Sequence, residues 1–416
     1  LPDKTKVFLK KTVFAIPVLF QENDEQSVKI KKLSKDIGFL KSELLKLTDT
    51  MPRTQIKEII SKKNEKYELT YYKLNLPSHY DWGLKPVAYI EQTNDHIYLS
   101  SGNGNFIKIN KTQIGTNKLN YETVDTNIEN LISDEQFYDS YILSVKDLFI
   151  NDNKIYFSFG NLKDECFYIK IFRADLNKEM FEFKKFFEHQ ECKKDRVGMN
   201  YQHIGGRIVS FKDNKILLSV GDFGDINTPQ DKDSIFGKII SIDLIDSKFE
   251  IISTGSRNAQ GLYYDRTNKY ILTTEHGPKG GDEINLISGK NPNIIVNLGW
   301  PISSYGEHYL KEKERLTGWS FEKNNPYLKY PLYKSHEKYG FLEPIKFYTP
   351  SIGISQIQAI DEKNKIYIHA SLVDQSLYLF KLNENNQIMK SLRFNIKERI
   401  RDISKFNNKL VLFLET

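Results

Sequence analysis

Short runs of alternating apolar and polar residues fill the chain from about residue 67 onward. One signature recurs in these runs: a turn with Asn or Asp, a basic residue or His, and then a strand rich in β-branched and aromatic residues. Asn and Asp tolerate turn dihedrals, and β-branched and aromatic residues suit a pleated strand. The copies of this signature span residues 94–101, 151–160, 212–221, 266–275, 362–371 and 406–415.

A second strand-like segment precedes each copy, and two more follow most of them. Four strands in a repeat of about 45–60 residues are typical of a β-propeller. The pattern therefore predicts an all-β fold, a six-bladed β-propeller over residues 67–416. The sixth repeat stops after two strands, and a propeller must close its ring or leave open edges. We therefore expect the segment Tyr67–Leu74 to complete the last blade.

Residues 1–66 follow a different pattern and are predicted to form an N-terminal, membrane-proximal helical extension. Apolar residues alternate spacings of three and four and predict a helix over residues 24–48. These apolar residues are Ile30, Leu33, Ile37, Leu40, Leu44 and Leu47. The helix either packs on the body of the same chain or forms a homo-oligomer, and the pattern leaves both open. The apolar stretch 7–20 is too short to span a bilayer; it is either the edge of a removed anchor or signal, or an element packed on the body.

Composition excludes several classes of protein. With 416 residues, 39% of them hydrophobic, the chain can bury a sizeable core, so it is not disordered as a whole. No apolar run approaches 18 residues, which excludes a membrane-embedded body. The net charge of +6 is spread along the chain without a basic stripe interleaved with aromatic residues, so we expect no nucleic-acid partner.

The two cysteines fall at informative places in the second repeat. Cys166 begins its third strand and Cys192 follows its fourth. Neighbouring ends of antiparallel strands lie side by side, so a disulfide is geometrically possible. Such a bond would persist only in an oxidising compartment, and the alternative is a pair of free buried thiols.

Two segments at the entries of innermost strands carry candidate chemistry. His203 precedes two glycines at the entry to the third repeat, where a histidine can exchange protons near neutral pH, although a lone histidine in a turn is more often structural. Arg257 and Asn258 enter the fourth repeat and offer donors to a carboxylate, a quinone oxygen or a sugar hydroxyl. The alternative for Arg257 is a structural tie between neighbouring blades.

A third segment, residues 275–285, combines Gly-Pro and Gly-Gly turns with two carboxylates. The turns allow backbone carbonyls to point outward, and Asp282 and Glu283 add anionic oxygens. Carbonyl and carboxylate oxygens are the ligands that Ca²⁺ accepts.

In order and spacing, these segments resemble one family. The run HIGGRIVSF, LLSVGDFGD, QDKDSIFGKIISIDL, SRNAQGLYYD, TTEHGPKGGDEINLI and NLGWP, within residues 201–301, is similar to the soluble quinoprotein glucose dehydrogenases and aldose sugar dehydrogenases, the glucose/sorbosone dehydrogenase family. The resemblance continues more loosely to residue 416 and does not cover residues before about 67. It implies a six-bladed propeller that binds pyrroloquinoline quinone (PQQ) and Ca²⁺.

The resemblance implies roles for particular residues. His203 resembles the general base that takes a proton from the sugar hydroxyl while hydride passes to the quinone. Arg257 would stabilise negative charge on the quinone oxygen, and Asn258 would contact the cofactor. Arg399 and Arg401 resemble a basic pair that holds the cofactor carboxylates.

The same resemblance assigns Ser351 to a position near the cofactor. It assigns the carbonyls of Gly277 and Pro278 to the Ca²⁺ that polarises the cofactor. Asp282 and Glu283 would form a second, structural Ca²⁺ site.

Three departures from the family pattern affect the cofactor site. Val373 stands where the family usually has a Lys for a cofactor carboxylate, and residues 139–144 contain no Gln where many members carry one. Gln202 precedes the candidate base where some members have Asp. Loss of one charge-assisted contact costs roughly 1.5–3 kcal/mol, which weakens cofactor binding without abolishing it.

The sequence thus predicts a PQQ-dependent dehydrogenase of an aldose sugar or a related alcohol. It would work in the periplasm or another compartment outside the cytoplasm, anchored to the membrane through a segment upstream of Leu1, and pass electrons to an acceptor that the sequence does not name. The segment 303–348 contains no copy of the strand signature and is expected to shape the substrate pocket. The alternative is a cofactor-free propeller that acts as a binding module.

Overall fold

The computed structural model describes residues 59–415 except 64–66, 75–79, 82–84, 117–118, 133–143, 164–165, 195–202, 213, 289–293 and 308–329. The chain divides into two compact units, Leu1–Arg53 and Thr54–Thr416. All described residues belong to the second unit. The predicted helix over 24–48, the apolar stretch 7–20, Gln202 and most of the segment 139–144 lie outside the described residues.

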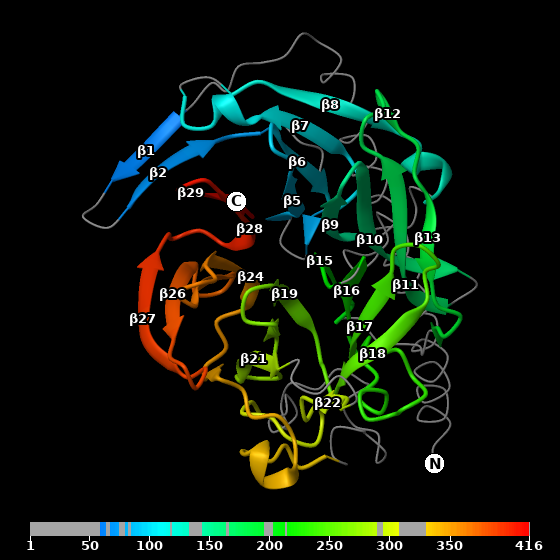
Figure 1. The fold of residues 1–416 in the computed structure, drawn as a ribbon, viewed down its shortest axis with the longest axis vertical. Helices are drawn as coiled ribbons and strands as arrows, with labels where there is room; N and C mark the ends of the chain where they lie inside the picture. The colour runs from blue at the N-terminus through cyan, green and yellow to red at the C-terminus, as the bar shows by residue number, and fades with distance from the viewer. Residues whose placement is uncertain are drawn as a thin grey trace, which may run out of the picture. The chain divides into compact units, whose positions relative to one another are not determined.

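Five antiparallel sheets of four strands form the blades of the second unit, arranged in a ring around a common centre (Figure 1). The first blade contains, from the innermost strand outward, β5 (Ala88–Gln92), β6 (His96–Ser101), β7 (Phe106–Asn110) and β8 (Tyr121–Thr126). In the same order, the second contains β9 (Val145–Asn151), β10 (Lys154–Lys163), β11 (Cys166–Asp175) and β13 (Lys184–Glu188). The third contains β15 (Gly205–Ser210), β16 (Lys215–Val220), β17 (Lys238–Asp243) and β18 (Phe249–Thr254). The other two blades contain β19 (Ala259–Asp265), β20 (Tyr270–Glu275), β21 (Asp282–Ser288) and β23 (Lys346–Tyr348), and β24 (Ile354–Asp361), β25 (Ile366–Ser371), β26 (Ser376–Leu382) and β27 (Ile388–Asn395). The short strands β12 (Met180–Phe181), β14 (Lys193–Lys194) and β22 (Val296–Asn297) extend the edges of blades.

The prediction of six four-stranded blades is wrong in the described part of the chain, because only five sheets reach four strands. At the sixth position, β28 (Ile400–Phe406) and β29 (Lys409–Leu414) form a two-stranded sheet. β28 contacts β24 on one side and β5 on the other, so six innermost strands still close the ring. All six copies of the strand signature form strands (β6, β10, β16, β20, β25 and β29), each paired with the innermost strand beside it.

The segment predicted to complete the last blade forms β2 (Glu68–Tyr72), but its ladder partner is β1 (Ile59–Lys63). The two-residue strands β3 (Tyr80–Asp81) and β4 (Lys85–Pro86) follow. Side chains of the β2 region nevertheless pack beside β29: Tyr67 and Leu69 in one hydrophobic cluster, Tyr72 and Leu74 in the next. The β1 strand places residues 59–63, which we assigned to the N-terminal extension, in the second unit.

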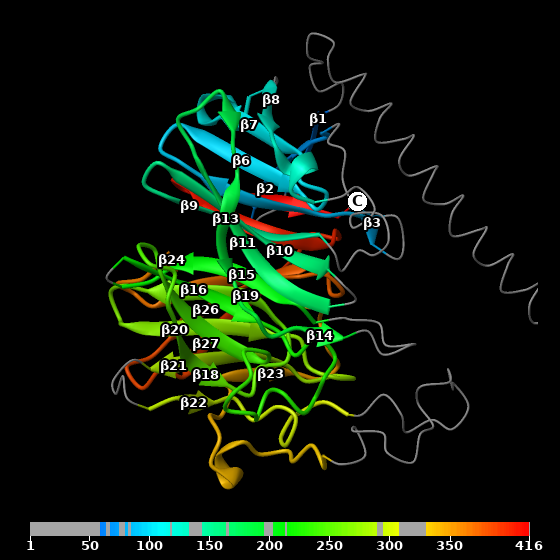
Figure 2. The same cartoon turned by 90° about the vertical axis from the view of Figure 1, so that its right-hand side faces the viewer.

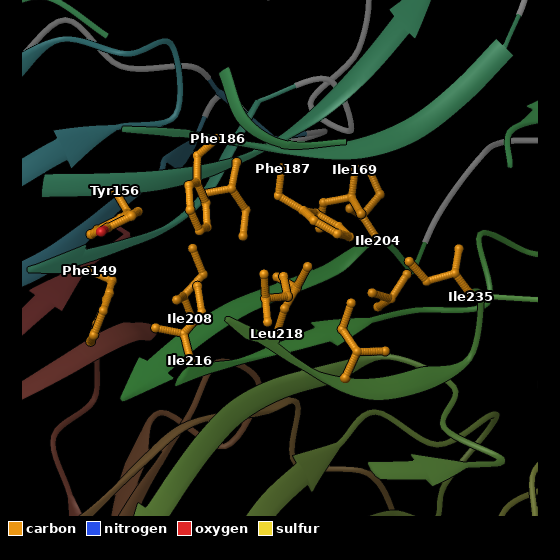
Figure 3. Packing of buried hydrophobic residues seen from close by; sticks show 14 of the residues in the cluster. Phe149, Tyr156, Ile169, Phe186, Phe187, Ile204, Ile208, Ile216, Leu218 and Ile235 are labelled. Carbon is orange, nitrogen blue, oxygen red and sulfur yellow. The ribbon is translucent and has the colours of Figure 1, made fainter. Parts of the chain in front are cut away.

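Hydrophobic side chains fill the spaces between neighbouring sheets. One cluster lies between the second and third blades, with Phe149, Tyr156 and Phe187 on one side and Ile208 and Leu218 on the other (Figure 3). Similar clusters lie between the other neighbouring sheets. Because each sheet buries both faces in this way, the innermost strands are held in fixed positions around the centre.

Three further features bear on the predictions. Cys166 and Cys192 form a disulfide, at the adjacent strand ends where the repeat pattern made one possible. The outermost strand of the fourth blade, β23, comes from the segment 303–348, in which no copy of the strand signature was expected and which therefore also contributes to a blade. The helical elements in the described residues are short 3₁₀ turns, η1 (Lys111–Gln113), η2 (Ile128–Asn130) and η5 (Glu337–Tyr339), and none of the described helices could cross a membrane.

Candidate functional site

The site lies at one end of the ring. Antiparallel pairing places the start of each innermost strand beside the end of the second strand of the same sheet, as in the pairs Gly205–Val220 and Ala259–Glu275. Residues that precede an innermost strand or follow a second strand therefore gather at one end, which can be followed in the side view (Figure 2). Seven predicted site residues occupy such positions: His203, Arg257, Asn258, Ser351, Arg399, Gly277 and Pro278. Arg401 is the second residue of β28, and Asp282 and Glu283 begin β21, whose start pairs with the end of β20 at the same end of the ring.

The imidazole of His203 lies between a carboxylate and a guanidinium. Its Nδ1 is 2.8 Å from Asp222 Oδ1, and its Nε2 is 2.9 Å from Arg257 Nη2. Asp222 is fully buried and also accepts hydrogen bonds from the Gly224 amide and, at 2.8 Å, from Trp300 Nε1. The structure thus brings the predicted base and the predicted guanidinium into direct contact.

The chemistry of the neighbours fixes the tautomer of His203. A guanidinium can only donate, so Nε2 accepts from Arg257 and the ring proton is on Nδ1, which donates to Asp222. Burial and then the charge of Arg257 lower the pKa of His203 below its ordinary 6.5, against the opposing effect of Asp222. The imidazole is therefore neutral at pH 7, with its basic lone pair on Nε2.

The backbone at His203 is held in a strained conformation. Its φ is +67°, in the left-handed region that non-glycine residues rarely adopt. A close crossing of two strands maintains it, because a Cβ on Gly221 would lie only 1.7 Å from the His203 carbonyl oxygen. Gly205, at φ +71°, crosses closely in the same way. The two glycines therefore permit the close backbone approach that holds His203 at the entry of β15.

Arg257 is buried and mostly satisfied by backbone. Its Nη1 donates to the carbonyls of His276 and Gly277, both at 2.8 Å, and its Cζ lies 5.3 Å from the centre of the Trp300 ring. Its Nε is buried without a hydrogen-bond partner among the described residues. A cavity of about 270 Å³, including space open to solvent, lies beside the guanidinium and is lined in part by Pro278.

A buried carboxyl group holds the backbone of the Arg257–Asn258 segment. Glu275 accepts from the Ser256 hydroxyl at 2.6 Å and from the amides of Arg257 and Asn258 at 3.1 and 3.0 Å. Burial raises the pKa of Glu275 to about 7, although these hydrogen bonds oppose the shift. Glu275 therefore positions both candidate cofactor contacts through their amides.

A chain of side chains connects this cluster to the basic pair. Asn258 Oδ1 accepts from the Gly205 amide at 3.2 Å and from Gln260 Nε2 at 2.9 Å. Gln260 Oε1 in turn accepts from Arg401 Nη1 at 3.2 Å. His203, Arg257 and Arg401 thus belong to one connected site, with Gln260 as the link.

The predicted basic pair already contacts a carboxylate of the chain. Arg399 Nε is 2.9 Å from Glu415 Oε2, and Arg401 Nε is 2.5 Å from Glu415 Oε1. The side chain of Glu415 is fully buried, whereas those of Arg399 and Arg401 are 19% and 12% exposed. The two guanidinium groups therefore share one internal anion.

Two of the predicted calcium ligands, Asp282 and Glu283, have other partners in the structure. Asp282 accepts from three amides, those of Gly277, Ile352 and Ile354, at 3.0–3.2 Å. Glu283 Oε1 lies 3.3 Å from His336 Nε2. Among the described residues, no group of three or more His, Cys, Asp and Glu side chains could hold a metal ion. The two carboxylates therefore belong to no such group, and Asp282 acts as a structural link between two loops; the Ca²⁺ contact of the Gly277 and Pro278 carbonyls stays a prediction.

Ser351 lies in one of the two loops that Asp282 joins. Its neighbour Ile352 donates to Asp282 and accepts from the amide of Val373 at 2.9 Å. The Ser351 hydroxyl is buried and has no partner among the described residues. The side chain of Val373 is 64% exposed and adds no charge at this position.

Sequence reasoning missed the carboxylates that organise the site. Asp222, Glu275 and Glu415 each follow or end the second strand of a repeat, and each contacts residues at the start of an innermost strand. The signal was present, because the strand signature ends in an acidic residue in the fourth and sixth copies and is followed by one in the third. The contact of Trp300 with Asp222 had no such signal.

Fold and site together define a class: an all-β propeller with an imidazole and several guanidinium groups at one end of its ring of innermost strands. The chain belongs to the Glucose / Sorbosone dehydrogenase family, whose match covers residues 143–416.

Individual relatives are more distant. An uncharacterised protein of Synechocystis is 28% identical, over 61% of this chain and 62% of its own length. Aldose sugar dehydrogenase YliI of Escherichia coli is 32% identical, over 26% of this chain and 31% of its own length. The chain thus spans less than two thirds of the length of either curated relative.

Solved structures share the fold. A glucose dehydrogenase is 18% identical with a TM-score of 0.59, over 81% of this chain and 94% of that one. The PQQ-bound aldose sugar dehydrogenase of Streptomyces coelicolor is 18% identical with a TM-score of 0.53, over 79% of this chain and 87% of that one. At such identities the likeness is one of fold.

Proposed function

We propose that this protein is a PQQ-dependent dehydrogenase of an aldose sugar or a related alcohol, with His203 as the general base. Membership of the family supports the reaction class. The observation that carries the proposal is the His203 geometry: Nδ1 donates to Asp222 and leaves the Nε2 lone pair beside Arg257. A neutral, oriented imidazole in a buried polar site is what removal of a hydroxyl proton requires.

The donor set fits PQQ better than it fits Ca²⁺. Arg257 Nε and the Ser351 hydroxyl are buried polar atoms without partners among the described residues. The guanidinium N–H groups of Arg399 and Arg401 that are not engaged by Glu415, Gln260 or Leu372 can donate to carboxylate and carbonyl oxygens. We assign these residues to the cofactor and assign no role to a metal ion.

When bound, PQQ would supply the acceptor for the substrate hydride. The residues of the chain do the rest. A substrate hydroxyl replaces the Arg257 contact at His203 Nε2 and gives its proton to that nitrogen. Asp222 stabilises the imidazolium that forms at His203. Arg257 stabilises negative charge that develops next to its guanidinium.

Replacement of His203 by Ala tests the base. Loss of positioned general-base catalysis lowers turnover by about 10²–10⁴-fold. We expect this loss in a dye-linked assay of the PQQ-reconstituted protein, with cofactor binding retained. His96→Ala is the matched control, because His96 lies on β6 outside the site. Turnover retained in the His203 variant would contradict the assignment.

A cofactor-free binding propeller is the second candidate, and one observation favours it. Glu415 already neutralises part of the basic pair expected to hold the cofactor. Titration of the apoprotein with PQQ, followed by absorbance, separates the two functions: no bound quinone spectrum would favour the binding module.

We also propose that the protein works outside the cytoplasm. The Cys166–Cys192 disulfide supports this compartment, because such bonds persist in oxidising surroundings. Thiol counting under denaturing, non-reducing conditions on protein from its native source is the test, and two free thiols would contradict the proposal.

A further inference from the structure

The Glu415 carboxylate lies at the centre of the basic end of the site. Its Oε2 accepts from Arg399 Nε, and its Oε1 is within 2.5 Å of both Arg401 Nε and Arg401 Nη2. Its own amide donates to the Arg399 carbonyl at 3.0 Å, which fixes the residue against the innermost strand. Buried to this degree, the side chain is a permanent part of the site.

Contacts within the chain engage five of the ten N–H donors of the two guanidinium groups. Arg401 uses Nη1 for Gln260 Oε1, in addition to its two contacts with Glu415. Arg399 uses Nη1 for the Leu372 carbonyl at 3.4 Å. The two arginines and Glu415 together carry a net charge of about +1, and charge-assisted hydrogen bonds to an incoming anion weaken accordingly.

The position after Leu372 adds no charge to this end of the site. The residue after Leu372 is Val373, whose side chain is 64% exposed and apolar. A ligand with several carboxylates therefore meets two guanidinium groups whose charge Glu415 partly neutralises, and a neutral side chain beside them.

We propose that Glu415 is a specificity-determining residue, which limits this end of the site to a ligand group of a single negative charge. This inference rests on the proposed function, because PQQ is a tricarboxylate and is the ligand on which the limit acts. The chain then binds PQQ weakly, through one carboxylate, because Glu415 competes with PQQ for Arg399 and Arg401.

Calorimetric titration of the full-length apoprotein with PQQ tests the proposal. Glu415→Gln removes the charge and keeps the shape, so we expect it to bind PQQ about 10- to 100-fold more tightly than wild type, the effect of one charge-assisted contact. The gain should shrink as salt is raised. Glu415→Asp, which keeps the charge, should bind like wild type. Glu384→Gln is the matched control, because Glu384 is 97% exposed.

A second variant keeps the proposal falsifiable if Glu415→Gln fails to fold. Val373→Lys adds a cation at an exposed position and leaves Glu415 in place, so it should also tighten PQQ binding. Thermal unfolding midpoints establish that each variant is folded. Equal or weaker PQQ binding by a folded Glu415→Gln, or unchanged binding by Val373→Lys, would overturn the role of Glu415 alone. Absence of PQQ binding by wild type and all variants would overturn the proposed function with it.

Discussion

Replacement of Arg207 tests how the innermost strands of the ring are held together. Arg207 lies on β15, is 1% exposed, and contacts four other innermost strands, β5, β9, β19 and β28. Its Nη1 donates to Asp147 Oδ1 at 3.0 Å and to Asp402 Oδ1 at 2.9 Å. Nε and Nη2 donate to the backbone carbonyls of Gln260 and Arg401, at 2.7 and 3.1 Å. The guanidinium also stacks 4.9 Å from the Tyr89 ring.

Replacement of Arg207 by Met should be strongly destabilising. It leaves two fully buried carboxylates and two carbonyls without their common donor. Breaking a buried ion pair by removing one partner costs about 3–5 kcal/mol of unfolding free energy. Urea unfolding followed by fluorescence at pH 8 measures the loss.

The loss should also depend on pH. Burial already raises the pKa of Asp147 from 3.8 to about 7, and Arg207 opposes that shift. Burial raises the pKa of Asp402 in the same direction, again against Arg207. Without Arg207 both values rise further. A carboxyl whose folded-state pKa is raised contributes stability that is present below its unfolded pKa and is lost as pH rises through the folded value. The Arg207→Met variant should therefore lose less stability at pH 5 than at pH 8.

Arg393→Met is the control, because Arg393 is 48% exposed and pairs with Asp374 at 2.7 Å on the surface. An exposed pair contributes about 0–1 kcal/mol. If Arg207→Met and Arg393→Met lost the same stability at pH 8, the buried cluster would not hold the innermost strands as we argue.

Three further predictions concern the site and the disulfide. The turnover of the reconstituted enzyme should fall toward acid pH only below 6.5, because the pKa of His203 is lowered and protonation of Nε2 removes the base; an acid limb above 6.5 in a pH–rate profile would contradict this. Asp222→Asn should keep the His203 tautomer, since its amide oxygen can still face Nδ1, but its NH₂ group then meets Trp300 Nε1–H, so urea unfolding should show a loss of about 1–3 kcal/mol. Cys166 and Cys192 are 26 residues apart, and reduction of their disulfide should lower the free energy of unfolding by about 3 kcal/mol in the same urea assay. An unchanged urea midpoint would contradict this prediction.

The local pattern of apolar and polar residues predicted the strand pairs within each blade. It did not predict which segment pairs with the last blade to close the ring. The signature in residues 94–101 and its five counterparts specifies a strand by its own alternation, so each was found where expected. The last blade depends instead on which distant segment pairs with β29. Alternation in Tyr67–Leu74 could predict a strand but not its ladder partner, because β1 was hidden in a segment without a clear period.

The same distinction applies to the site. The motif around His203 and the Arg257–Asn258 pair placed these residues at the same end of the ring, and they are in contact. The turns around Asp282 predict a metal ligand, but they could not reveal the three amides that donate to its carboxylate in the structure. A sequence shows which groups are present, but only the fold shows which donors reach them first.

The repeated architecture explains why this site organises its cations with acids. In three repeats a carboxylate at the end of the second strand faces the start of an innermost strand: Asp222 orients His203, Glu275 holds the amides of Arg257 and Asn258, and Glu415 pairs with Arg401. In the first two cases the acid positions a group and leaves its chemistry free. In the third the acid contacts the guanidinium itself, so the same structural position becomes a limit on the charge of the ligand. A change of one residue at this position can therefore alter proton transfer, backbone geometry or ligand affinity, depending on the repeat in which it occurs.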